Sequence, residues 1–159
     1  MRTVSDQFLS VTIDSGAITH NWDNLDLKSE GVINMGKALA PALLRIGGTS
    51  EDFVIFKYQA DSNDTQGIVK NRLHVKAHRS NITLTASQWD AINEFTQTVG
   101  WDLIFGLNVF LRNPWPNGSW DTTNAEELMR YSISKGYDIN WELGNGMYSK
   151  LHTIYLLTS

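Results

Sequence analysis

The sequence contains no cysteine among its 159 residues. A disulfide framework, a cysteine-ligated zinc site and a thiol nucleophile are therefore excluded. No apolar run approaches the ~20 residues needed to cross a bilayer, so no transmembrane segment is predicted. Positive charge is also scarce, because 13 Lys and Arg residues stand against 17 Asp and Glu, for a formal net charge of −4. Binding of nucleic acid through bulk positive charge is excluded, whereas a local basic site is not.

The residues that are present suit an ordinary folded core. Hydrophobic residues make up 42% of the chain and aromatic residues 11%, including six Trp, which argues against disorder. The first seven residues lack the apolar stretch of a signal peptide. Three Asn-x-Ser/Thr sequons nevertheless offer candidate glycosylation sites at Asn63, Asn81 and Asn117. They give weak support to a secretory origin.

Short apolar segments alternate with helical patterns along the chain. Strands are predicted at 8–13, 43–46, 103–107 and 139–143, each ending in a small or polar cluster. Helices are predicted at 25–39, 85–99 and 122–134. The polar stretch 58–80 is predicted to be a loop or an insert. This alternation predicts an α/β fold with a parallel sheet and right-handed crossovers.

Two architectures fit four strands connected in this way. One is a small open doubly wound sheet, and the other is the first half of a (β/α)8 barrel, a fold that needs ~250 residues. Both place function in the loops that follow the carboxyl ends of the strands. The positions to inspect are therefore Asp14, Gly47-Gly48-Thr49, Asn108 and Gly144-Asn145.

Two local patterns carry less weight. The turn Gly47-Gly48-Thr49 could approach a phosphate in an unrelated α/β domain, but it lacks the spacing of a dinucleotide or P-loop motif. His74 and His78 are one helical turn apart, without a third ligand or the zincin glutamate, so no metal and no cofactor is predicted. The basic residues within 72–79 suit a solvated face or a local contact for an acidic ligand.

Four segments in order, 8–14, 44–49 with 52–56, 102–108 with 111–112, and 134–145, resemble the heparanase-type endo-β-glucuronidases of glycoside hydrolase family 79. The resemblance implies a retaining (β/α)8 glycosidase that cleaves heparan sulfate next to glucuronic acid. Such proteins are secreted, lysosomal or membrane-associated. The expected fold is a partial TIM-type barrel of about four βα units. Residues 1–146 would form its N-terminal half and 147–159 an unmatched tail.

The resemblance also implies the site. Retaining glycosidases use two carboxyl groups ~5–5.5 Å apart, an acid/base and a nucleophile. In the family pattern the acid/base Glu directly follows an Asn at the end of the fourth strand, and the nucleophile lies on a later strand. Here Gly146 follows Asn145, and a glycine has no proton to donate. Glu142 is four residues earlier, within the strand, and is assigned a structural role.

Three residues can be carried over as substrate-binding by resemblance, namely Asp14, Thr49 and Asn145. No catalytic residue is intact, so the chain alone is expected to be inactive. The alternative is a non-catalytic glycan-binding or regulatory fragment. Heparan sulfate or a related glycosaminoglycan is the expected partner, bound weakly. A half barrel would also leave strand edges open, which favours a homodimer or aggregation.

Overall fold

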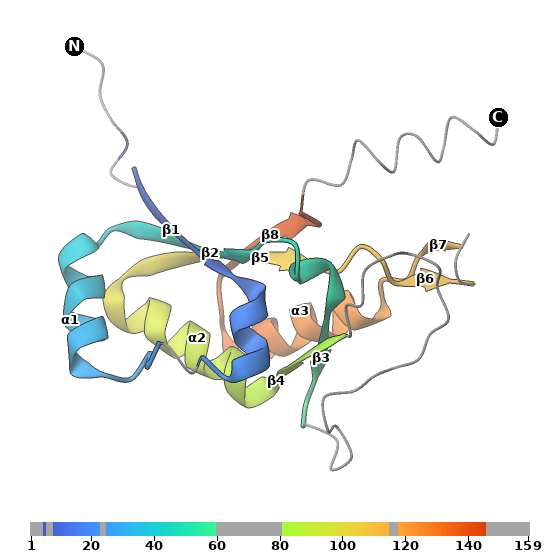
Figure 1. Cartoon of the computed structure of the whole chain (residues 1–159), viewed down its shortest axis with the longest axis horizontal. Helices are drawn as coiled ribbons and strands as arrows, with labels where there is room; N and C mark the ends of the chain where they lie inside the picture. Colours follow the sequence, from blue (N-terminus) through green and yellow to red (C-terminus); the bar gives the residue numbers. More distant parts are fainter. Residues whose placement is uncertain (1–4, 6–7, 23–24, 60–80, 115–117, 146–159) are drawn as a thin grey trace.

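The computed structural model describes residues 5, 8–22, 25–59, 81–114 and 118–145. Its centre is a four-stranded parallel sheet in the order β1-β2-β5-β8 (Figure 1). These strands are β1 (Leu9–Asp14), β2 (Ala42–Gly47), β5 (Trp101–Leu107) and β8 (Ile139–Leu143). All four predicted strands are present, with bounds that differ from the prediction by two residues or fewer. The predicted α/β class with parallel strands is confirmed.

Three helices connect these strands, α1 (Glu30–Leu39), α2 (Ala86–Val99) and α3 (Thr123–Lys135). Helix α2 begins where predicted because Thr85 and Gln88 form a capping box. It ends at Gly100, whose φ of 75° suits glycine. Helix α1 begins five residues later than predicted. The reason is local: Ser29 accepts the Val32 N–H at 3.3 Å and thereby caps the helix at that point.

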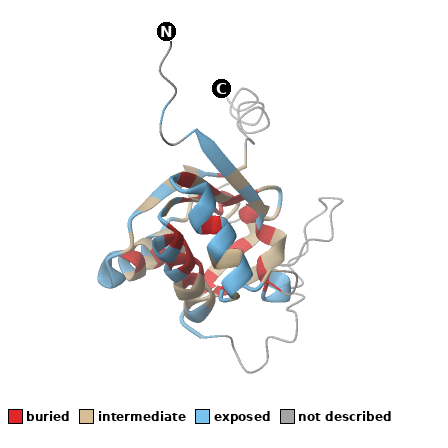
Figure 2. Ribbon diagram, turned by 90° about the vertical axis from the view of Figure 1, so that its left-hand side faces the viewer, coloured by how far each residue is buried: buried red, intermediate tan, exposed pale blue. Residues whose placement is uncertain are grey.

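The helices cover one face of the sheet (Figure 1). Alternate residues of β2 and β5, among them Leu44, Ile46 and Phe105, point into the core between the two layers and are buried. Trp89 of α2 is fully buried there and packs edge-on against Phe105. Figure 2 shows the buried residues gathered inside this layer pair. The hydrophobic core therefore lies between the sheet and the helices. The edge of the sheet where the strands end is not part of this core.

The other face of the sheet carries no helix among the described residues. The strand register aligns Thr12 with Arg45, Arg45 with Ile104, and Ile104 with Asn140 across this face. None of these four is buried. A doubly wound sheet would have helices on both faces, whereas a barrel keeps them outside and turns the other face inward. The structure therefore agrees with a partial barrel, and the open face corresponds to the barrel interior.

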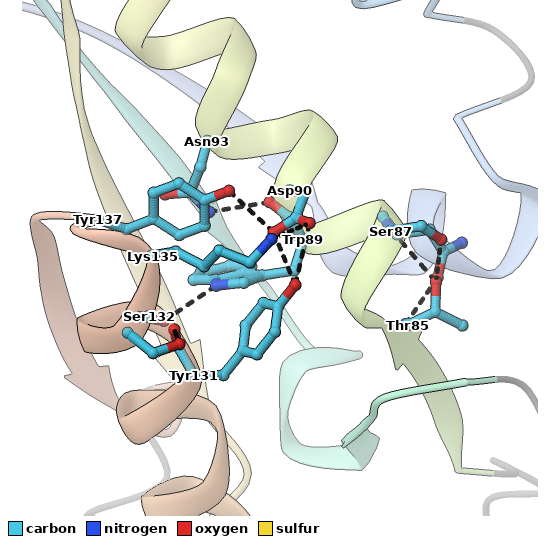
Figure 3. Close-up of polar contacts among 11 residues, drawn as sticks. Thr85, Ser87, Trp89, Asp90, Asn93, Tyr131, Ser132, Lys135 and Tyr137 are labelled. Atoms are coloured by element: carbon cyan, nitrogen blue, oxygen red, sulfur yellow. Dashed lines mark hydrogen bonds and ion pairs between the residues drawn. The ribbon is translucent and has the colours of Figure 1, made fainter.

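An ion-paired cluster joins α2 to α3 on the helix side (Figure 3). Asp90 accepts hydrogen bonds from Lys135 at 3.0 Å, from the Tyr137 hydroxyl at 2.8 Å and from the Tyr131 hydroxyl at 2.9 Å. Burial opposes ionisation of Asp90, but these three donors together lower its pKa. Beside it, the indole N–H of Trp89 donates to the Ser132 hydroxyl at 3.0 Å. These contacts fix the two helices against each other.

Two small strand pairs were not predicted. Strand β3 (Val54–Lys57) pairs in parallel with β4 (Ile82–Thr85), and β6 (Arg112–Asn113) pairs antiparallel with β7 (Ser119–Trp120). Two short 3-10 helices, η1 (Ser15–His20) and η2 (Glu51–Phe53), follow β1 and β2. Most of the predicted 58–80 loop lies outside the described residues. Within the described ranges, no helix combines the length and the apolar character needed to cross a membrane.

Candidate functional site

Polar residues gather at the carboxyl ends of the four parallel strands. Asp14 ends β1, the Gly48-Thr49 turn follows β2, Asn108 follows β5, and Asn145 closes the turn after β8. Because the strands are parallel and in sequential order, these ends share one edge of the sheet. The sequence-predicted positions are thus brought to one side of the molecule.

Arg45 of β2 connects the residues at this edge. Its Nε donates to Glu142 Oε2 at 2.6 Å and its Nη2 to Glu142 Oε1 at 2.9 Å, a two-bond pair between β2 and β8. The same Nη2 donates to Asn145 Oδ1 at 3.3 Å and to Glu51 Oε2 at 3.4 Å. The hydrogen bonds to Glu142 raise the pKa of Arg45. Both carboxylate oxygens of Glu142 are thus taken up by this pair, and its structural role stays a prediction.

Glu51 is the buried carboxyl of the site, and the sequence analysis missed it. Its side chain is fully buried (0% exposed), and its Oε2 accepts the Gly48 N–H at 2.9 Å. Burial, helped by the nearby charge of Glu142 and opposed by Arg45, raises its pKa to about 7. A Cβ on Gly47 or Gly106 would collide with this carboxyl group. The two glycines thus create the space that the carboxyl occupies.

Asp14 and the Gly48-Thr49 turn lie against each other. The Gly16 N–H donates to Asp14 Oδ1 at 2.7 Å, which fixes the carboxylate at the end of β1. Gly48 has a φ of 99°, and a Cβ there would stand 2.6 Å from Asp14 Oδ2, so only glycine fits this close approach. Both Asp14 and Thr49 are exposed. The structure therefore places Asp14 against the glycine that precedes Thr49, and leaves both Asp14 and Thr49 open to solvent.

Asn145 is held from two sides. Arg45 binds its side chain, as described above, and its backbone N–H reaches Asp52, a residue that is only 2% exposed. Burial raises the pKa of Asp52, while the backbone N–H groups of Asn145 and Val109 act in the opposite direction. Asp52 thereby links the loops after β5 and β8. This second buried acid was also missed from the sequence.

The remaining predicted positions divide into two groups. Asn108 is buried and structural, because its Nδ2 donates to the Val54 carbonyl at 3.2 Å and its Oδ1 accepts the Phe110 N–H at 2.9 Å. Asn81 is exposed at the start of β4. Outside the described residues lie Gly146, Asn63, Asn117, His74 and His78, with the basic residues of 72–79 and the tail 147–159. Among the described positions, no three acidic or histidine side chains converge as metal ligands would.

A parallel sheet with helices on one face and polar residues at its carboxyl edge is the arrangement of part of a (β/α)8 barrel. The sequence model of the glycosyl hydrolase family 79 N-terminal domain matches residues 16–155, and the chain belongs to this family. The predicted family membership is thus confirmed.

The chain is similar to proteins named heparanase, inactive heparanase-2 and heparanase-like protein. It is 34% identical to heparanase of Mus musculus over 178 aligned positions, covering 91% of this chain and 33% of that protein. It is 29% identical to inactive heparanase-2 of Homo sapiens, covering 91% of this chain and 32% of the relative. Heparanase-like protein 3 of Arabidopsis thaliana is 32% identical, with coverage of 90% and 30%. The chain thus spans about a third of the length of these relatives.

Proposed function

We propose that residues 1–146 form the N-terminal half of a retaining family 79 glycosidase that acts on heparan sulfate or a related glucuronate-containing glycosaminoglycan. We further propose that these residues bind the glycan weakly and do not cleave it by themselves. The observation that carries this proposal is Gly146, which stands directly after Asn145 where the family pattern has the acid/base Glu. A retaining mechanism needs a carboxyl group to protonate the leaving oxygen, and glycine cannot replace it.

Binding is supported by the groups that remain at the sheet edge. Asp14 and Thr49 are exposed and adjacent to the same glycine turn, where a carboxylate and a hydroxyl can hydrogen-bond to sugar hydroxyl groups. Arg45 donates to the Asn145 side-chain oxygen, which directs the amide nitrogen of Asn145 to serve as a donor. A hydrogen bond from this position to a sugar 2-OH is the contact that strengthens in a glycosidase transition state.

Glu142 is a poor substitute for the missing acid. Both of its carboxylate oxygens accept hydrogen bonds from the Arg45 guanidinium. An acid catalyst must instead reach the leaving-group oxygen of the substrate. Glu142 would therefore have to give up its Arg45 pair before it could contact that oxygen.

The experiment combines a cleavage assay with a binding assay on the whole chain. Heparan sulfate incubated with the protein is expected to keep its chain length on size-exclusion chromatography. Calorimetric titration with a glucuronate-containing oligosaccharide is expected to show weak binding, reduced about threefold to tenfold by Thr49→Val or Asn145→Ala, the loss of one hydrogen bond each. Thr98→Val, on the exposed side of α2, is the matched control. Shortened oligosaccharides whose release is lost in Glu142→Gln would overturn the proposal of inactivity.

The alternative function is a non-catalytic glycan-binding or regulatory protein. The relative named inactive heparanase-2 supports this reading, since it shows that catalysis is not general among the proteins similar to this chain. The two functions differ in one measurement. Binding of the oligosaccharide without any cleavage, also in Gly146→Glu after the rest of a family 79 barrel has been added, favours the alternative.

We propose an extracellular or lysosomal location for the protein. The exposure of Asn81 at the start of β4 supports glycosylation at that sequon, because the oligosaccharide needs an accessible asparagine. Expressed in a secretory system, the chain is expected to lose mass on treatment with an N-glycosidase. The loss of mass should be smaller for Asn81→Gln than for the wild type. An equal loss of mass in the two proteins would show that Asn81 does not carry a glycan.

A further inference from the structure

Glu51 is the more deeply buried of the two buried carboxyl groups, Glu51 and Asp52, at the described sheet edge, and neither catalysis nor direct glycan binding accounts for it. It belongs to η2, and its side chain reaches back into the open face of the sheet over Gly47 and Gly106. Burying a carboxyl group in a small protein is costly unless its charge is compensated. Gly47 and Gly106 leave space that fits the Glu51 carboxyl group closely, which indicates that Glu51 has a specific role at this position.

The contacts of Glu51 reach both halves of the proposed binding edge. On one side, its Oε2 accepts the Gly48 N–H at 2.9 Å, in the turn that presents Thr49. On the other side, the same oxygen accepts Arg45 Nη2 at 3.4 Å, and this nitrogen also holds Asn145 Oδ1 at 3.3 Å. Glu51 is therefore bonded to the residue next to Thr49, and it is linked to Asn145 through Arg45.

We propose that Glu51 is a positioning residue for the glycan-binding edge, and that loss or gain of its proton changes how firmly the Gly48-Thr49 turn and Arg45 are held. The effect on ligand affinity rests on the proposed function, whereas the effect on the turn does not. Glu51 Oε1 has no hydrogen-bond partner among the described residues, so the proton would reside on this oxygen while Oε2 keeps its two donors.

The charges around Glu51 determine the direction of the effect. Asp14 ends β1 beside Gly48, Arg45 comes from β2, and Asp52 is the neighbour of Glu51 in η2. Glu142 faces Glu51 from β8, and β5 approaches its carboxyl group at Gly106. When Glu51 is neutral, Arg45 and Glu142 balance each other. When Glu51 is ionised, Arg45, Glu142 and Glu51 together carry one net negative charge. An anionic sugar next to this edge is then repelled, and its affinity falls.

The pKa of about 7 that burial gives Glu51 puts this change in the neutral range. One elementary charge close to an anion in a partly solvated site changes the dissociation constant by about fivefold. Affinity for an anionic ligand is therefore expected to be about fivefold higher at about pH 5.5 than at about pH 8.

The test follows the Gly48 amide by NMR across the pH range in the full chain and its Glu51→Gln variant. Glu94→Gln, an exposed carboxyl on α2, is the matched control. In the wild type and in Glu94→Gln, the Gly48 amide shift is expected to titrate with a midpoint near 7, and in Glu51→Gln it is expected to stay constant. A wild-type midpoint between about 4 and 5 overturns the inference without any need for the variant to fold.

The same three proteins are then titrated with a heparan-type tetrasaccharide that carries a glucuronate. The wild type and the control are expected to bind about fivefold more tightly at the lower pH, and Glu51→Gln to bind with a nearly constant affinity. Equal pH profiles in all three proteins overturn the positioning role. If no protein binds the tetrasaccharide while the Gly48 amide titrates as expected, the proposed function fails and the hold of Glu51 on the turn is supported.

Discussion

Glu51 should make the stability of the protein fall as the pH rises through the weakly acidic range. In the unfolded chain this carboxyl has the ordinary glutamate pKa of 4.5, and in the fold burial raises the pKa to about 7. Between these two values the folded protein binds the proton more tightly than the unfolded chain does. The unfolding free energy therefore decreases with increasing pH in this window and levels off above the folded pKa.

The size of the effect follows from the two pKa values. Each tenfold change in the acid dissociation constant corresponds to about 1.4 kcal/mol, so ionised Glu51 costs about 3 kcal/mol of unfolding free energy. This is a large fraction of the 5–15 kcal/mol typical of a domain, taken as a rough range. Asp52 changes stability in the same direction because burial raises its pKa too. Comparing the wild type with Glu51→Gln isolates the contribution of Glu51.

The assay is urea denaturation followed by tryptophan fluorescence, at about pH 5 and about pH 8 and at one protein concentration. The wild type is expected to lose about 2.5 kcal/mol of unfolding free energy between the two pH values, and Glu51→Gln to lose much less. Glu94→Gln should behave like the wild type. Equal losses in the wild type and in Glu51→Gln would refute the reasoning, because the buried carboxyl would then not be the group that titrates.

Four further outcomes are expected. Asp90→Asn removes the charged acceptor of three donors between α2 and α3 and should lower stability by about 2 kcal/mol in the same denaturation assay. Ser132→Ala leaves the Trp89 indole N–H buried without its acceptor, so the unfolding free energy is expected to fall by about 1–2 kcal/mol. An unchanged unfolding free energy would show that water replaces the hydroxyl as acceptor. Gly106→Ala should lower the melting temperature more than either change, because its methyl group meets the buried carboxyl. Strand edges β1 and β8 should make the chain a dimer or larger on size-exclusion chromatography with light scattering, and a monodisperse monomer with a sharp melt would contradict this.

Part of the candidate site could be predicted from the order of residues along the chain. Asp14, Thr49 and Asn145 could be singled out because each stands at the end of a predicted strand and matches a family position. Asn108 also follows a predicted strand, yet its side-chain amide is already bonded to the Val54 carbonyl of β3 and to the Phe110 N–H of its own loop. Position relative to a strand end therefore predicts which residues are near the edge of the sheet. It does not predict which of them have groups left over for a ligand.

By itself, the sequence determined the order of the main strands and helices, because apolar runs, capping residues and glycine stops act within a few neighbouring residues. The same is true of family membership and of the glycine at position 146. Only the tertiary structure decided the pairing of Arg45 with Glu142, which are 97 residues apart in the chain. It also decided the burial of Glu51, since a carboxyl in a loop acquires a raised pKa only when strands distant in the sequence close around it. Desolvation and charge pairing depend on distances in space, and these emerge only once the sheet has assembled.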